Sequence, residues 1–289
     1  MKNIYSRKSP DVRHVPNGIA ISGVEPLDLA ATFDCGQTFR WKPDTGNSFM
    51  GIVAGKIIIA SKQNNELVLK GASLSEADFW IKYFALDIDY TSLQNKLKSD
   101  AILRKCVDFS PGIRVLRQEF FETLITFIIS QNNNIPRIRG IVERLCANFG
   151  EPVKGRYAQT GLNAFPAAER LAECSDIELA PLRAGYRVAG IIDASKKIAS
   201  GEIKEEELLC AGFDDARKRL LSIYGVGPKI ADCVLLFGLG RFESFPADVW
   251  IKRAMENLFP GGLPNCAADV EGIAQQYIFH YVRSSGFIL

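Results

Sequence analysis

The first part of the chain alternates between apolar and polar positions. Between residue 15 and about residue 72, β-branched and aromatic side chains recur in short runs, separated by the turn sequences PDTGN and KQNN. The runs are GIAISGV, TFRWK, FMGIVAG, KIIIASK and ELVLKG. This pattern predicts an antiparallel sheet. The stretch PLDLAATFD between two of the runs has helical spacing, so we expect one helix to lie across that sheet.

From Ser73 onward the apolar positions follow the period of a helix. The segment SLSEADFWIKYFALD opens with serine and acidic residues, which are typical of a helix N-terminus. We expect helices at 75–87, 91–107, 117–131, 135–149, 165–174, 176–183, 187–200, 204–210, 213–222, 228–238, 248–258 and 266–284. The pattern therefore predicts an α+β protein in which an N-terminal sheet precedes a large all-α region.

This change of period suggests where the chain divides. We expect a tail at residues 1–14, a β-rich domain with its following helices at 15–110, and an all-α region of two helical subdomains at 111–289. The sequence shows no internal repeat and no low-complexity tract.

Composition narrows the class of protein. The chain has 289 residues, 47% of them hydrophobic and 24% charged, as in a soluble globular protein. It has no run of 18 apolar residues, and its polar, basic N-terminus lacks the apolar core of a secretory signal. We therefore expect a cytoplasmic protein without membrane contact. Its seven cysteines are an odd number without CxxC spacing, which disfavours a disulfide framework and a zinc site.

Charge alone does not indicate a nucleic-acid partner, because the net charge is only +2. The charge is unevenly distributed, however. The stretch from Arg137 to Arg156 contains five Arg or Lys and two acidic residues, and the stretch from Arg183 to Lys204 contains the same numbers. Local basic patches of this kind can hold phosphates.

The segment LLSIYGVGPKIADCVLLFGLG predicts a helix-hairpin-helix. One helix ends near Ile223, the turn contains Gly225, Val226 and Gly227, and Pro228 stands where a new helix begins. Glycines let the turn approach a phosphate closely, and the free N–H groups at the start of the next helix can bind the anion. Such a hairpin grips the DNA backbone without reading its sequence.

Lys229 and Asp248 are the candidate catalytic pair. Lys229 lies in the first turn of the predicted helix, where the helix dipole disfavours a protonated amine and so favours a nucleophilic one. Asp248 follows Pro246 at the expected N-cap of the next helix. If the intervening helix folds back, the two side chains can face each other across a cleft. Each residue alone is more often structural, but LxxIxGVGxKxAD followed by PxDV is a far more specific combination.

These motifs resemble the core of the helix-hairpin-helix (HhH-GPD) superfamily of DNA glycosylases. From about Gly23 to Phe287 the chain also resembles the 8-oxoguanine DNA glycosylases. The motifs that carry this closer resemblance are CGQTFRW, FIISQNNNIPRIRGIVERLC, AGYR and AQQYIF. The resemblance implies a TBP-like sheet domain, a monomer, double-stranded DNA containing 8-oxoguanine as the partner, and no cofactor. In a prokaryote such a protein would be associated with the nucleoid.

The resemblance also implies a bifunctional reaction in base-excision repair. Lys229 would attack C1′ of a flipped 8-oxoguanine nucleotide paired with cytosine, form a Schiff base and assist strand cleavage by β-elimination. Asp248 would stabilise the positive charge that develops on the sugar. The carbonyls of Leu221, Ile223 and Val226 would hold a monovalent cation at the hairpin, with no catalytic metal.

The same resemblance assigns residues to the damaged base. The carbonyl of Gly36 would accept a hydrogen bond from N7–H of 8-oxoguanine, a hydrogen that guanine lacks. Phe279 and Cys233 would pack on the two faces of the base and Gln275 would contact its Watson–Crick edge, with Pro246 also in the pocket. Considered alone, Phe279 and Cys233 would more often be core residues.

Four more residues are assigned to the gap in the duplex. Asn132 would fill the space left by the flipped nucleotide, and Arg137 and Arg187 would bond the orphaned cytosine. Tyr186 would wedge into the base stack. Without the other motifs, Asn132 to Asn134 would be interpreted as a polar loop that ends a helix.

Three observations bear on the alternatives. Trp250 stands where eukaryotic members carry a histidine near the DNA phosphate. Glycosylases for alkylated bases generally lack the lysine, and endonuclease III types carry four clustered cysteines, whereas only Cys266 follows Cys233 here. A non-catalytic DNA-binding module that uses the hairpin for phosphate contact stays open from the sequence.

Overall fold

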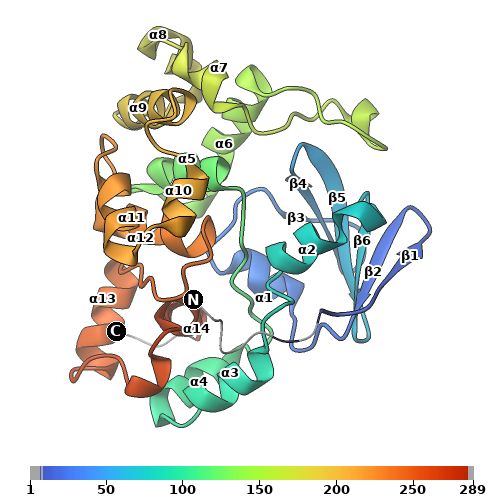
Figure 1. The fold of residues 1–289 in the computed structure, drawn as a ribbon, viewed down its shortest axis with the longest axis vertical. Coiled ribbons are helices and arrows are strands. Elements are labelled where there is room, and N and C mark those ends of the chain that lie inside the picture. The colour runs from blue at the N-terminus through green and yellow to red at the C-terminus, as the bar shows by residue number, and fades with distance from the viewer. Residues whose placement is uncertain (1–6, 8, 286–289) are drawn as a thin grey trace.

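A computed structural model describes residues 7 and 9–285, in which a sheet lies at one side and helices at the other (Figure 1). The sheet is antiparallel with strand order β1-β2-β6-β5-β4-β3, which confirms the predicted α+β class. Its strands are β1 Val12–Val15, β2 Gly18–Ser22, β3 Lys42–Pro43, β4 Ser48–Val53, β5 Lys56–Gln63 and β6 Glu66–Lys70. The alternating residues of these strands pack with helices α1 (Leu29–Asp34) and α2 (Ala77–Tyr83) in one small core, so α1 is the predicted helix across the sheet.

The tail and one predicted strand differ from expectation. Residues 1–6 and 8 of the expected tail lie outside the described residues, and its end forms β1, which pairs with β2. The run TFRWK is strand only from Lys42. Before it, the Gln37 side chain donates to the carbonyl of Thr32 and accepts from the N–H of Leu116, both at 2.8 Å, so this segment bonds to helix α1 and to the loop before α5 instead of a strand.

The helical region contains most of the predicted helices, with shifted ends. The expected helix at 91–107 is two helices, because Asp100 accepts hydrogen bonds from the N–H groups of Ile102 and Leu103 and so starts a new one. The ranges expected at 176–183 and 266–284 each divide into a 3₁₀ turn and an α-helix. The α-helices are α3 Tyr90–Leu97, α4 Ala101–Phe109, α5 Phe120–Ser130, α6 Ile135–Phe149, α7 Ala168–Ala172, α8 Asp176–Leu179, α9 Arg187–Ala199, α10 Glu205–Cys210, α11 Phe213–Leu221, α12 Pro228–Phe237, α13 Val249–Leu258 and α14 Glu271–Ser284. The 3₁₀ turns are Leu74–Glu76, Ala158–Thr160, Ala180–Leu182 and Asn265–Ala267.

The side chains of the chain form two hydrophobic cores, and the expected division into 15–110 and 111–289 stays a prediction. Buried side chains of α3 and α4 belong to the large helical core, although they follow the sheet in the sequence. Arg114 joins the two parts, since its guanidinium is fully buried and donates to the carbonyls of Val24 and Ala85. Among the described residues no helix is long and apolar enough to cross a lipid bilayer.

Candidate active site

The hairpin turn has the geometry that its sequence predicts. Gly225 has φ +75°, a left-handed conformation that glycine adopts without strain, and the N–H of Val226 donates to the carbonyl of Ile223 at 3.0 Å. No atom lies within 4 Å of a Cβ built on Gly225 or Gly227, so the outer face of the turn is open. Pro228 begins α12 as expected. The turn is therefore accessible to a phosphate, and its role in binding one stays a prediction.

An ion pair holds the two helices of the hairpin together. The guanidinium of Arg217 on α11 donates to both carboxylate oxygens of Asp232 on α12, at 2.6 and 3.1 Å. This fork geometry fixes direction as well as distance. Asp232 is buried, so the pair fixes the position of α12 relative to the turn.

Lys229 and Asp248 come from different helices and line the same open cleft, which has a volume of about 910 Å³. Lys229 lies in the first turn of α12, with Nζ 5.1 Å from the ring centre of Phe127. Asp248 caps α13, because its side chain accepts from the N–H of Ile251 at 2.9 Å. The predicted N-cap is thus confirmed. The cleft is lined by an amine and a carboxylate, which is the pair that lysine-based covalent catalysis uses.

Gly36 and Phe279 meet in this cleft from opposite ends of the chain. Gly36 has φ +78°, and a Cβ built there would lie 3.2 Å from Cε1 of Phe279, so a side chain would crowd the ring. The absence of a side chain lets the backbone approach the ring. Both residues line the cleft, as their assignment to a base-binding pocket requires.

Three residues assigned to the damaged base do not line the cleft. Cys233 is buried, and burial raises the pKa of its thiol to about 11, although the Lys229 amine beside it opposes this shift. Gln275 is also buried, and its Oε1 accepts from Nε2 of Gln276 at 3.0 Å. Pro246 is buried as well. Contact between these residues and a base stays a prediction.

The residues assigned to the gap in the duplex differ in their exposure and in their hydrogen bonds. Asn132 and Tyr186 line the cleft, and Tyr186 is 63% exposed. Arg137 is exposed in the first turn of α6. Arg187 is 4% exposed, and its guanidinium donates to the carbonyls of Gln131, Asn132 and Ala184. Its assigned bond to cytosine would require some of these bonds to be exchanged.

The sequence did not single out three further residues of the cleft, Phe39, Phe127 and Lys252. Phe39 contacts Phe127 edge-on, with ring centres 6.1 Å apart, and the Phe127 ring lies near the Lys229 amine. Lys252 lies one turn after Asp248 on α13, and this spacing could have indicated its position. Trp250 also lines the cleft and is 42% exposed. The described residues contain no group of three or more His, Cys, Asp or Glu that could hold a metal ion.

Comparison with known proteins places this arrangement in a family. Residues 19–124 match the model of the N-terminal domain of 8-oxoguanine DNA glycosylase, and residues 125–263 match that of the HhH-GPD superfamily base excision DNA repair proteins. The chain is 33% identical to an N-glycosylase/DNA lyase of Saccharomyces cerevisiae over 78% of its own length and 67% of that protein.

Two solved structures share the whole fold. One is MBOgg1 in complex with a low-affinity DNA ligand, with 34% identity and a TM-score of 0.90 over 97% of this chain and all of that chain. The other is the Clostridium acetobutylicum 8-oxoguanine glycosylase/lyase in complex with double-stranded DNA containing cytosine opposite 8-oxoguanine. It has 31% identity and a TM-score of 0.89 over the same fractions. The chain therefore belongs to the 8-oxoguanine DNA glycosylase/lyase family, within the helix-hairpin-helix superfamily of base-excision DNA repair proteins.

Proposed function

We propose that this protein excises 8-oxoguanine paired with cytosine from double-stranded DNA through a lysine Schiff base, and then cleaves the strand by β-elimination. The observation that carries the proposal is the shared cleft, which holds Lys229 at the start of the hairpin helix and Asp248 at the next helix cap. The family membership of the chain and the DNA complex of its Clostridium relative support the substrate.

The chemistry follows from the two side chains. The lone pair of the unprotonated Lys229 Nζ forms a bond to C1′ while the bond from C1′ to the base breaks, and the base leaves with that electron pair. The carboxylate of Asp248 stabilises the positive charge on the sugar as this bond breaks. The C1′–O4′ bond then breaks while a proton moves from the lysine nitrogen to O4′, which opens the sugar ring and gives the Schiff base. Loss of a proton from C2′ then breaks the C3′–O bond and releases the 3′ phosphate as the leaving group.

Recognition of the lesion follows from donor and acceptor chemistry. In 8-oxoguanine N7 carries a hydrogen, which the carbonyl of Gly36 can accept, whereas guanine presents a lone pair there. Phe279, which meets Gly36 in the cleft, supplies an aromatic face for the flipped base. Opposite the lesion, Tyr186 enters the base stack, Asn132 fills the gap, and the guanidinium groups of Arg137 and Arg187 bind the cytosine.

Borohydride trapping tests the covalent step against the alternative of a non-catalytic DNA-binding module. With an 8-oxoguanine:cytosine duplex, the parent chain should leave a reduced protein–DNA adduct that Lys229→Gln abolishes. Lys252→Gln is the matched control, because Lys252 lines the same cleft and should retain the adduct. A parent chain that binds the duplex without any trapped adduct would refute the proposal and favour the binding module.

A further inference from the structure

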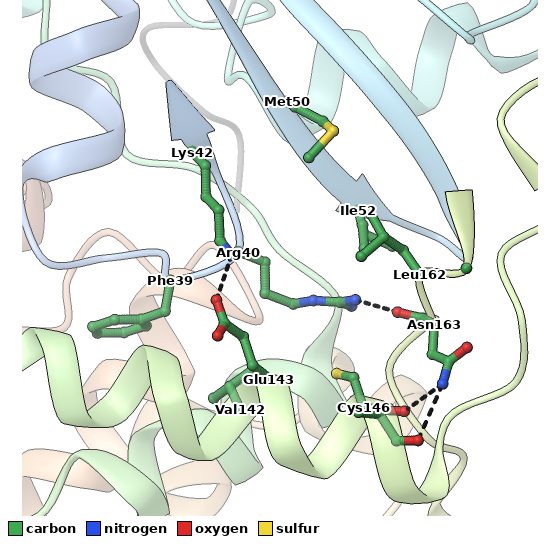
Figure 2. A pocket seen from close by; sticks show the side chains of 12 residues that line it. Phe39, Arg40, Lys42, Met50, Ile52, Val142, Glu143, Cys146, Leu162 and Asn163 are labelled. Carbon is green, nitrogen blue, oxygen red and sulfur yellow. Dashed lines mark hydrogen bonds and ion pairs between the residues drawn. The ribbon is translucent and has the colours of Figure 1, made fainter. Parts of the chain in front are cut away.

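A second cavity lies between the sheet and helix α6 and shares Phe39 with the active-site cleft. Its volume is about 290 Å³, and Figure 2 shows side chains converging on it from the segment with Phe39 and Arg40, from β4, from α6 and from the loop after α6. Met50 and Ile52 come from β4, Cys146 comes from α6, and Leu162 comes from the loop that follows α6. We call this cavity the interdomain pocket. Ligand sites commonly form at such junctions and are largely apolar with a few polar groups.

A buried arginine supplies the polar group of the interdomain pocket. The Arg40 side chain is 10% exposed. It donates to the carbonyl of Asn163 at 2.7 Å and to the carboxylate of Glu122 at 3.2 Å (Figure 2 shows the first bond). A guanidinium has five N–H donors in a planar fork, so these two bonds leave donors for an incoming acceptor.

The charges around the pocket favour an anion. Arg40 and Lys42 are the basic residues that line it, and Glu143, paired with Lys42 at the mouth, is the acidic one. Burial raises the pKa of Glu122 to about 7, so Arg40 has only a partial counter-charge at neutral pH. An added carboxylate would complete the neutralisation of Arg40 in a bidentate pair.

The remaining lining favours an aromatic ring. Phe39, Met50 and Cys146 present a ring and two sulfur atoms, and sulfur contacts aromatic rings favourably. The planar guanidinium of Arg40 can also stack on a ring. The volume lies just below the range for drug-sized ligands, so the pocket suits a molecule of one or two rings.

Phe39 connects this pocket to the active site. It lines both the interdomain pocket and the cleft, and its edge contacts the Phe127 ring that lies beside the Lys229 amine. It also belongs to the segment that carries Gly36, whose backbone meets Phe279. An occupant of the pocket would contact Phe39 and so limit the movement of its ring when a nucleotide enters the cleft.

We propose that the interdomain pocket is an effector site, which binds a small planar aromatic carboxylate and restrains the active-site cleft through Phe39. Binding is independent of any activity of the chain. The effect on rate rests on the excision activity proposed above.

Methyl NMR on the full chain tests binding, because the sequence has only three methionines. Met50 lines the pocket, and Met255 on α13 serves as an internal reference. In a titration of the methyl-¹³C-methionine-labelled chain, naphthalene-2-carboxylate should shift the Met50 methyl signal until the shift saturates, and should leave the Met255 signal unchanged. Naphthalene-2-carboxamide, which has the same shape without the charge, should bind about tenfold more weakly because it loses the charge-assisted bond to Arg40.

A blocked pocket provides the control. Ala147 is exposed at the pocket, so Ala147→Phe should fold normally, fill the mouth and abolish the Met50 shift. An unmoved Met50 signal, equal shifts of Met50 and Met255, equal affinity for the carboxamide, or an undiminished shift in Ala147→Phe would each overturn the site.

Single-turnover excision tests whether a ligand in the interdomain pocket slows the reaction in the active-site cleft. Saturating naphthalene-2-carboxylate should slow excision by the parent chain about fivefold, at the lower end of common allosteric couplings, and should leave Ala147→Phe unaffected. An unchanged parent rate at full occupancy would overturn the role of Phe39. A chain that binds the carboxylate but never excises 8-oxoguanine would refute the proposed function and leave the site standing.

Discussion

The two sides of the active-site cleft are built in different ways. On the catalytic side, Lys229 and Asp248 are placed by helix starts, through bonds such as that from the N–H of Ile251 to Asp248 three residues away. On the side assigned to the opposite base, the Gln131–Asn132 backbone is held by Arg187, which is 55 or more residues distant. Local helix starts therefore place the two candidate catalytic residues, whereas long-range contacts fix the loop that would meet the orphaned cytosine.

The two sides of the cleft also differ in backbone conformation. Asn132 has φ +44°, a left-handed conformation that costs energy for most residues but that asparagine tolerates best. The catalytic helices have no such requirement, because Lys229 and Asp248 occupy ordinary first-turn and N-cap positions. The loop at Gln131 and Asn132 thus depends on its partners for its shape, and we expect it to be the more easily disturbed side.

The largest effect should come from Asp248. Asp248→Asn keeps an N-cap of nearly equal quality, so thermal unfolding should hardly change. It removes the negative charge, and excision should slow by about 10²–10³-fold, as when one group that stabilises a transition state is lost. Single-turnover excision and a melting curve on the same preparation measure both.

Asp248→Ala serves as the comparison variant. It removes both the charge and the cap, so it should show the same rate loss together with about 1 kcal/mol less stability. If Asp248→Asn retained the parent rate, the carboxylate would have only a capping role.

The next largest effect should come from Arg187 on the opposite side. Arg187→Lys keeps a positive charge but cannot reach the carbonyls of Gln131, Asn132 and Ala184 together. We expect a loss of about 2–3 kcal/mol in the free energy of unfolding, since buried acceptors lose a charged donor. Urea unfolding measures the loss, and excision opposite each of the four bases measures the preference for cytosine.

Arg137→Lys provides the matched control for Arg187. Arg137 is exposed, so this variant should unfold like the parent and alter only the preference for cytosine. If Arg187→Lys also unfolded like the parent, the backbone bonds of Arg187 would contribute nothing, and the two sides of the cleft would not differ as described.

The same contrast explains what the sequence could predict. The helix starts at Lys229 and Asp248 were predicted because glycine, proline and aspartate signals act over a few residues. Both residues line one cleft, as expected if the intervening helix folds back. The bonds from Arg187 to the carbonyls of Gln131 and Asn132 left no local signal, so its burial was not foreseen. Contact between residues so far apart depends on packing, and no spacing rule contains it.

The sheet shows the same limit. Most strands were predicted because one face is buried and the alternation is clear. Strand β1 was missed because its ends are half-buried and its middle is exposed, so its pattern lacks an apolar face. Residues 38–41 were overpredicted as strand, because the Gln37 amide beside them bonds to the backbone of Thr32 and Leu116, which periodicity cannot reveal.

A smaller effect should appear in the pH dependence of stability. Burial raises the pKa of Glu122 on α5 from its usual 4.5 to about 7, against the opposing charge of Arg40. Between these values the folded chain retains a proton that the unfolded chain has lost, so stability should fall as pH rises from about 4.5 through 7. The full change in pKa corresponds to about 3 kcal/mol. Because the Glu122 side chain is 20% exposed, solvent screening should reduce its contribution to about 1–2 kcal/mol. Urea unfolding at several pH values measures this slope of stability against pH, and Glu122→Gln should remove it. Equal slopes in the parent and the variant would contradict the raised pKa of Glu122.

The smallest effect on stability should come from Tyr186, the exposed member of the opposite-base side. Its ring is 63% exposed and stacks beside the Arg187 guanidinium at 4.5 Å, so Tyr186→Ala should change the free energy of unfolding by less than about 0.5 kcal/mol. A wedge acts only when DNA is bent, and the variant should therefore bind and bend a lesion duplex more weakly. Bending measured by fluorescence transfer between duplex ends, beside a urea curve, separates the two effects. Lost stability with normal bending would mean that Tyr186 supports Arg187 and does not enter the base stack.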